Sequence, residues 1–189
     1  EALNALKQAN IGLLQLNSPD SPQKLQDNIK KLSTVLNKTA EGKRLMAHVE
    51  SLSSQLNTHA FAKENVAFLL TMSDNKLRLA GRGTSGDAMI NLMSGAKNVA
   101  DFDNYRTVTA ESLLALSPTI ILVVSRQQDN ALSSLMAAHP SLNYTPAAKH
   151  GHLYSIAGDS LIAGLSVKAI EEVLRIQNQV RLQQADAQQ

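Results

Sequence analysis

The chain has 189 residues, of which 43% are hydrophobic and 18% charged, and its formal net charge is +2. This size allows one large domain or two small lobes, and no clustered Lys or Arg residues indicate a nucleic-acid surface. The longest apolar run, residues 120–124, is far shorter than the roughly 20 residues of a membrane span, and the lack of cysteine excludes disulfides and thiolate chemistry.

The first third of the chain predicts a strand followed by two helices. Residues 10–16 form a short apolar run typical of a strand. Ser21 then offers an N-cap and Pro22 a suitable first position for a helix. This helix carries apolar residues spaced by three or four positions: Leu25, Ile29, Leu32 and Leu36. Thr39 is the expected cap of a second helix that continues to about His59.

The rest of the chain alternates strands with helices. Residues 65–72 and 76–81 predict the two strands of a β-hairpin, after which Thr84 caps a helix that ends at Gly95. The following pattern predicts a helix to Leu116, a buried strand over 118–125, a helix over 127–138, a strand over 152–158 and a terminal helix capped by Ser166. This order predicts an α/β fold whose sheet is mostly parallel after the hairpin.

Gly81, Gly83 and Gly86 match the spacing of a dinucleotide-binding loop. That motif needs a buried entering strand and an acidic residue about 20 positions further on, at the end of a strand. Here the entering strand is half polar, and Asp101 and Asp103 lie in an expected loop. The alternative is a hairpin exit followed by a helix N-terminus, which attracts carboxylates as readily as phosphates.

The sequence holds no complete catalytic motif. Neither a G-x-S-x-G nor an H-E-x-x-H pattern is present. Glu171 and Glu172 are adjacent on a predicted helix and point apart. His150 and His152 share one side of a predicted strand, but two ligands do not complete a metal site. The sequence therefore favours a protein that is not an enzyme.

A longer stretch carries a family resemblance. The segment "AGRGTSGDAMINLMSGAKNVADFDNYRTVTAESLLALSPTIILVV" resembles the C-terminal lobe of periplasmic haem-binding proteins that serve ABC transporters. The similar features are a Gly-Arg-x-Thr segment that opens a helix, a Tyr-Arg pair, "TAESL" and "PTIILVV", in this order. The family belongs to the siderophore and cobalamin binding-protein group. "TPAAKHGHLYSIAGDSLIAGL" resembles its closing strand and loop, and residues 2–57 resemble the end of its N-terminal lobe and its connecting helix.

The resemblance implies a two-lobed periplasmic binding protein with a long connecting helix. Residues 1–38 would be the remainder of the N-terminal lobe, 39–63 the connecting helix and 64–189 the C-terminal α/β lobe. The family's first half-lobe, with its haem-ligating tyrosine, does not match any part of this sequence, so we expect a truncated chain with an incomplete N-terminal lobe. An uncovered sheet edge in such a chain would favour a homodimer.

The implied function is that of a periplasmic haem carrier that delivers its cargo to the membrane subunits of an ABC importer. Two alternatives remain open at this point. The same fold could carry cobalamin or a ferric siderophore, or the chain could be a nucleotide-binding enzyme that uses residues 81–86.

The expected haem site lies at the carboxyl ends of the strands. Arg82 and Arg126 are candidates for ion pairs with the haem propionates, because a guanidinium can grip a carboxylate with two hydrogen bonds. Thr84 and Ser85 would add donors from the helix end. The alternative for each arginine is a surface salt bridge.

Three further positions complete the expected site. Tyr105 and Arg106 would line the rim of the cleft, unless they belong to a solvated loop. Met72 is the candidate iron ligand, with core packing as the alternative. Glu111 matches the family's acidic residue that contacts the membrane subunits, and it also suits the first turn of its own helix.

Overall fold

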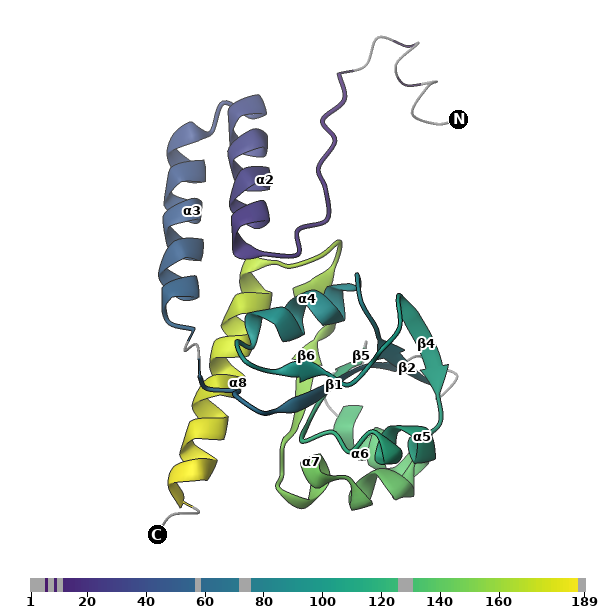
Figure 1. Cartoon of the computed structure of the whole chain (residues 1–189). Coiled ribbons are helices and arrows are strands. Elements are labelled where there is room, and N and C mark those ends of the chain that lie inside the picture. The colour runs from purple at the N-terminus through teal and green to yellow at the C-terminus, as the bar shows by residue number, and fades with distance from the viewer. Residues whose placement is uncertain are drawn as a thin grey trace.

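The computed structural model describes residues 6, 9, 12–56, 59–71, 76–125 and 131–186. It consists of a helical hairpin beside an α/β lobe (Figure 1). Within these ranges no helix combines the length and the apolar character that a membrane span requires.

The hairpin consists of α2 (Pro22–Val35) and α3 (Thr39–Ser54). The Ser21 side chain accepts a hydrogen bond from the Lys24 amide and Pro22 is the first helical residue, as predicted. The prediction for α3 was wrong at both ends. Lys38 precedes the helix without a side-chain cap, so Thr39 is already helical, and the helix ends at Ser54 instead of near His59.

The strand predicted over residues 10–16 is not observed in its described part. Residues 12–16 have no regular secondary structure. Their leucines stay exposed: Leu13 by 41%, Leu14 by 40% and Leu16 by 39%. An apolar run forms a strand only when a neighbouring strand satisfies its amide and carbonyl groups, and no described strand pairs with this one.

The lobe is built on one mixed sheet whose main path has the order β4-β2-β1-β5-β6. Strands β1 (Asn65–Thr71) and β2 (Leu77–Ala80) form the predicted antiparallel hairpin. Strands β5 (Ile120–Ser125) and β6 (Leu153–Ala157) continue the sheet in parallel, and the short β3 (Lys97–Asn98) also pairs with β1 in parallel. The predicted α/β class is confirmed.

Two strands were missed, the two-residue β3 and a longer strand at the edge of the sheet. Residues Tyr105–Val108 form β4, which pairs antiparallel with β2 at the edge of the sheet. The sequence "YRTV" is short and mostly polar, and its burial pattern shows no fully buried side chain. An edge strand of this kind lacks the apolar run that marks β1 and β5, so local pattern alone indicated a loop.

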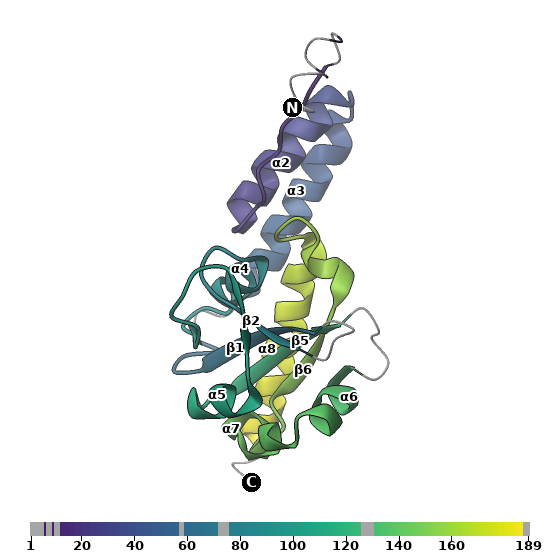
Figure 2. The ribbon, with the colours of Figure 1, turned by 90° about the vertical axis from the view of Figure 1, so that its right-hand side faces the viewer.

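Helices cover both faces of the sheet (Figures 1 and 2). On one face lie α4 (Ser85–Leu92) and α8 (Val167–Asp186), which pack on a core that includes Phe68, Leu122 and Ile156. On the other lie α5 (Ala110–Ala115), α6 (Ala131–Ala138) and α7 (Pro146–Lys149), with a core that includes Leu69 and Val123. Alternate residues of β1 and β5 therefore belong to different cores.

The hairpin joins the lobe at its lower end. Val49 of α3 is fully buried in the core that α8 also covers. Gln177 of α8 donates to the Gln55 carbonyl at 3.2 Å, and His48 lies 3.7 Å from Glu171. A second connection comes from the Leu165 amide, which donates to the Pro19 carbonyl at 2.8 Å. The upper part of the hairpin projects beyond the lobe (Figure 2).

Candidate functional site

The three glycines of the loop between β2 and α4 each have a packing or conformational reason. A Cβ on Gly81 would lie 2.2 Å from the Phe102 carbonyl oxygen, and one on Gly86 would lie 2.5 Å from the Phe68 ring. Gly83 has a φ of +77°, which favours glycine. The G-x-G-x-x-G spacing is therefore explained by the close approach of the chain to itself and of α4 to the sheet, without a nucleotide.

Thr84 is the N-cap of α4, as predicted. Its side-chain oxygen accepts from the Asp87 amide at 3.1 Å and donates to the Gly81 carbonyl at 2.8 Å. Asp87 in turn accepts from the Gly83 amide and from the Asn98 side chain. Both hydrogen-bonding directions of the Thr84 hydroxyl are thus used within the turn, so this side chain supports the loop.

Arg82 is held by two carboxylates of the loop that precedes β4. Its Nε donates to Asp103 at 2.9 Å, and its Nη1 donates to Asp101 at 2.6 Å. The hydrogen bonds to Asp101 and then Asp103 raise the pKa of the Arg82 guanidinium above its ordinary value. The surface salt bridge that was the alternative for Arg82 is therefore present, and a ligand carboxylate would compete with both aspartates.

Ser85 and Tyr105 come together, although 20 positions separate them in the chain. Their hydroxyl oxygens are 3.3 Å apart, and both side chains are partly buried. Arg106 does not join them. Its guanidinium carbon lies 4.6 Å from the centre of the Phe102 ring, a cation–π contact. Because successive residues of a strand point to opposite faces, the side chains of Tyr105 and Arg106 lie on different sides of the sheet.

Sequence reasoning did not single out Arg78. It lies in β2 between Leu77 and Leu79, and the pairing places it opposite Leu70 of β1 and Thr107 of β4. Its Nε is buried and has no hydrogen-bond partner among the described residues. The alternation of Leu77, Arg78 and Leu79 could have identified this residue from the sequence, because it places the arginine on the face opposite the two leucines.

Glu111 lies in the first turn of α5 and is exposed. Backbone hydrogen bonding and the side chains of Thr109 and Ser141 hold the pKa of its carboxyl below the usual value. Ser141 donates to Glu111 at 3.2 Å. The carboxylate is therefore charged at neutral pH and reachable from solvent.

Two predicted site residues, Met72 and Arg126, lie outside the described residues. Their roles as iron ligand and as propionate partner stay predictions. In the described part of the chain, no three His, Asp or Glu side chains are grouped in a way that could hold a metal ion. His150 and His152 have ring centres 6.1 Å apart, and the Nδ1 of each lies near a backbone carbonyl oxygen.

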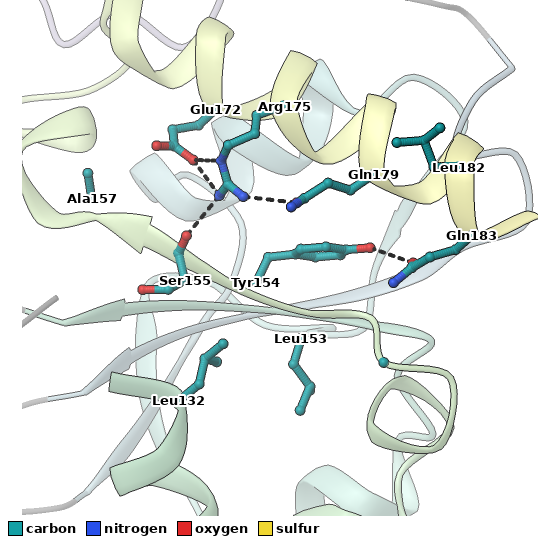
Figure 3. Close-up of a pocket in the computed structure, with 11 residues that line it drawn as sticks. Leu132, Leu153, Tyr154, Ser155, Ala157, Glu172, Arg175, Gln179, Leu182 and Gln183 are labelled. Atoms are coloured by element: carbon teal, nitrogen blue, oxygen red, sulfur yellow. Dashed lines mark hydrogen bonds and ion pairs between the residues drawn. The ribbon is translucent and has the colours of Figure 1, made fainter. Parts of the chain in front are cut away.

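A separate hollow of about 600 Å³ lies beside β6, at the opposite edge of the sheet from β4 (Figure 3). Its walls include Leu132 of α6, Leu153 and Ser155 of β6, and Arg175, Gln179 and Gln183 of α8. None of the predicted site residues that the structure describes lines it. The hollow is thus distinct from the loop around Arg82.

The polar groups of this hollow are largely paired with one another. Arg175 donates to Glu172, to Gln179 and, at 2.9 Å, to the Ser155 carbonyl (Figure 3). Tyr154 donates to Gln183 at 3.2 Å, and burial raises the pKa of Tyr154 to about 12. A charged side chain across an edge strand disfavours pairing with another strand. We interpret Arg175 as a residue that protects the β6 edge.

The chain belongs to the periplasmic binding protein family, whose model matches residues 4–159. This stretch includes the whole helical hairpin and the sheet through β6. No curated protein sequence matches the chain.

Solved structures with the same fold agree with this assignment. The periplasmic heme-binding protein HutB of Vibrio cholerae is 27% identical, with a TM-score of 0.79 over 95% of this chain and 71% of its own. A periplasmic heme-binding protein from Pseudomonas aeruginosa is 24% identical, with a TM-score of 0.73 over 94% of this chain and 66% of its own. The vitamin B12 binding protein BtuF of Vibrio cholerae is 16% identical, with a TM-score of 0.72 over 97% and 70%.

Proposed function

We propose that this chain is part of the substrate-binding component of an ABC importer and that its cargo is haem. The observation that carries the proposal is the likeness to HutB, a heme-binding protein, at 27% identity over 95% of the chain. The family match over residues 4–159 supports a binding role and a periplasmic location. Members of this class hold and deliver a ligand and do not transform it.

In this proposal α3 is the connection between two lobes and the sheet domain is the second lobe. Residues 1–38 belong to the first lobe and 64–189 to the second. The chain spans 71% of HutB and 66% of the Pseudomonas protein. Glu111 is the proposed contact to the membrane subunits, because its ionised carboxylate is exposed and would meet a basic pocket. Such a charge steers association even when it adds little affinity.

Haem binding can be tested directly by titrating the protein with hemin and recording the Soret band. We expect a red-shifted, saturable band at micromolar protein. This measurement reports haem binding alone and requires no transport assay. Absence of any spectral change in the full chain would remove haem from the proposal.

Cobalamin is the second candidate cargo, supported by the likeness to BtuF at a TM-score of 0.72. A ferric siderophore is a third cargo for the same fold. Competition separates these cases, since a bound cobalamin or siderophore would prevent the hemin spectrum from developing. The nucleotide-binding enzyme has lost its main support, because packing explains Gly81, Gly83 and Gly86.

A further inference from the structure

The side chain of Arg78 has an unusual environment for a cation. Its Nε is buried without a hydrogen-bond partner in the described part of the chain. The residue as a whole is only partly buried. A buried polar donor without a partner is costly, so native proteins nearly always supply an acceptor. A buried donor that the protein leaves unpaired is a position where a ligand can supply the missing acceptor.

The neighbours of Arg78 are hydrogen-bonding groups that are not acidic. Thr107 lies directly opposite Arg78 in the β2–β4 pair, and Tyr105 lies two residues away from Thr107 on the same face. A diagonal neighbour at this spacing is within reach of a long side chain. Ser85, in the first turn of α4, brings a second hydroxyl to 3.3 Å from that of Tyr105. Figure 1 shows α4 over the sheet and β4 at its edge.

The carboxylates close to this place are already in use. Asp101 and Asp103 accept from Arg82, and Asp87 accepts from Gly83 and Asn98. Arg82 is neutralised by its two aspartates, whereas the Nε of Arg78 has no acceptor in the described part of the chain. Among the described residues, Arg78 is therefore a cation of this lobe that can accept a new carboxylate.

We propose that Arg78, Thr107, Tyr105 and Ser85 form a carboxylate-binding subsite of the C-terminal lobe. The guanidinium supplies the charge and the fork of N–H donors, and the hydroxyl groups supply further donors. Arg82 then has a structural role, since it anchors the loop before β4. The inference rests on the proposed function, because the carboxylate bound here would be a propionate group of the haem cargo.

The first test compares hemin with its dimethyl ester, which lacks the free carboxylates. Arg78→Gln is expected to weaken hemin binding by about tenfold or more, as for the loss of a charged hydrogen bond, and to change binding of the ester by less than twofold. Arg181→Gln, an exposed site on α8 with the same change of charge, is the matched control and should leave both affinities unchanged. Equal hemin affinity for wild type and Arg78→Gln overturns the subsite, as does an equal loss for hemin and ester.

The second test measures the wild-type chain with a ligand other than haem, and a conservative substitution serves only to assign one signal. The Nε–H of Arg78 gives its own signal in a ¹⁵N–¹H spectrum, and Arg78→Lys, which lacks this group, identifies it. Titration of the wild-type chain with glutarate, a simple dicarboxylate, should shift this signal in a saturable way, whereas the Arg181 signal should stay in place. An unmoved Arg78 signal overturns the subsite. A shift with glutarate in a protein that does not bind hemin supports the subsite and refutes haem as the cargo.

Discussion

Helices of the hairpin and of the α/β lobe both carry apolar stripes, but the stripe of α8 in the lobe is far more deeply buried, with Ile170, Val173 and Ile176 at 0% exposure. Helix α2 has no buried residue, and α3 has only Gly42 and Val49. In the lobe, Ile120, Ile121, Leu122 and Val123 of β5 are all fully buried. Leu32 and Val35 of α2 and its C-cap residue Leu36 are exposed by 42%, 61% and 58%, although their spacing is that of a core stripe. An apolar stripe therefore indicates which side of a helix can be buried, and the neighbouring elements decide whether it is.

The largest expected effect is a difference in the free energy of unfolding when one large apolar side chain is removed from each region. Phe68→Ala in β1 removes a side chain that is 1% exposed and packs beneath α4. It should lower the free energy of unfolding by about 3 to 5 kcal/mol. Leu32→Ala, at a half-exposed site of α2, should cost less than about 1 kcal/mol, because 42% of the side chain's surface already contacts water and little apolar area is lost from burial. Urea unfolding of both variants measures the difference, and similar costs would mean that the hairpin is as well packed as the lobe.

A smaller effect is expected from adding one methyl group in each region. A Cβ on Gly86 would meet the Phe68 ring at 2.5 Å and the Ala80 side chain at 2.7 Å, whereas one on Gly12 would meet nothing within 4 Å. Gly86→Ala should therefore destabilise the lobe by about 1 to 3 kcal/mol through overpacking. Gly12→Ala should leave the thermal midpoint unchanged. A neutral Gly86→Ala would return this glycine to the ligand-binding candidates.

The smallest effect should be the same in both regions, because it depends on exposed charges. Lys24 lowers the pKa of Asp20, beside the hairpin, and Lys168 lowers the pKa of Asp159 in the lobe. A depressed carboxyl pKa gives stability that is present above the unfolded value, near pH 4, and is lost as the pH falls through the folded value. Asp20→Asn and Asp159→Asn should each slightly flatten the acid side of a stability–pH profile. A large change in the stability–pH profile for only one of these variants would show that exposed charges contribute differently to the stability of the hairpin and of the lobe.

Most of the lobe could be predicted from its local sequence. The buried runs of β1 and β5, the alternation of β2 and the capping residue Thr84 each act over a few positions, so their outcome is visible in the sequence. The edge strand β4 was not predicted, and residues 12–16 were wrongly predicted to be a strand. Both errors concern features that local sequence does not determine. Strand formation there depends on a partner that is distant in the chain, or lacking among the described residues.

The candidate site also has features that local sequence predicts and features that depend on tertiary structure. The sequence by itself determined that a capped helix follows a glycine-rich turn with an arginine in it, because turns and caps are local. The three-dimensional arrangement was needed to show that Arg82 meets Asp101 and Asp103 and that Ser85 meets Tyr105. It was also needed to show that the Nε of Arg78 is buried without a partner among the described residues. Each of these depends on strand register and on packing between layers, which bring together groups some 20 positions apart in the chain and fix whether a charge is already neutralised.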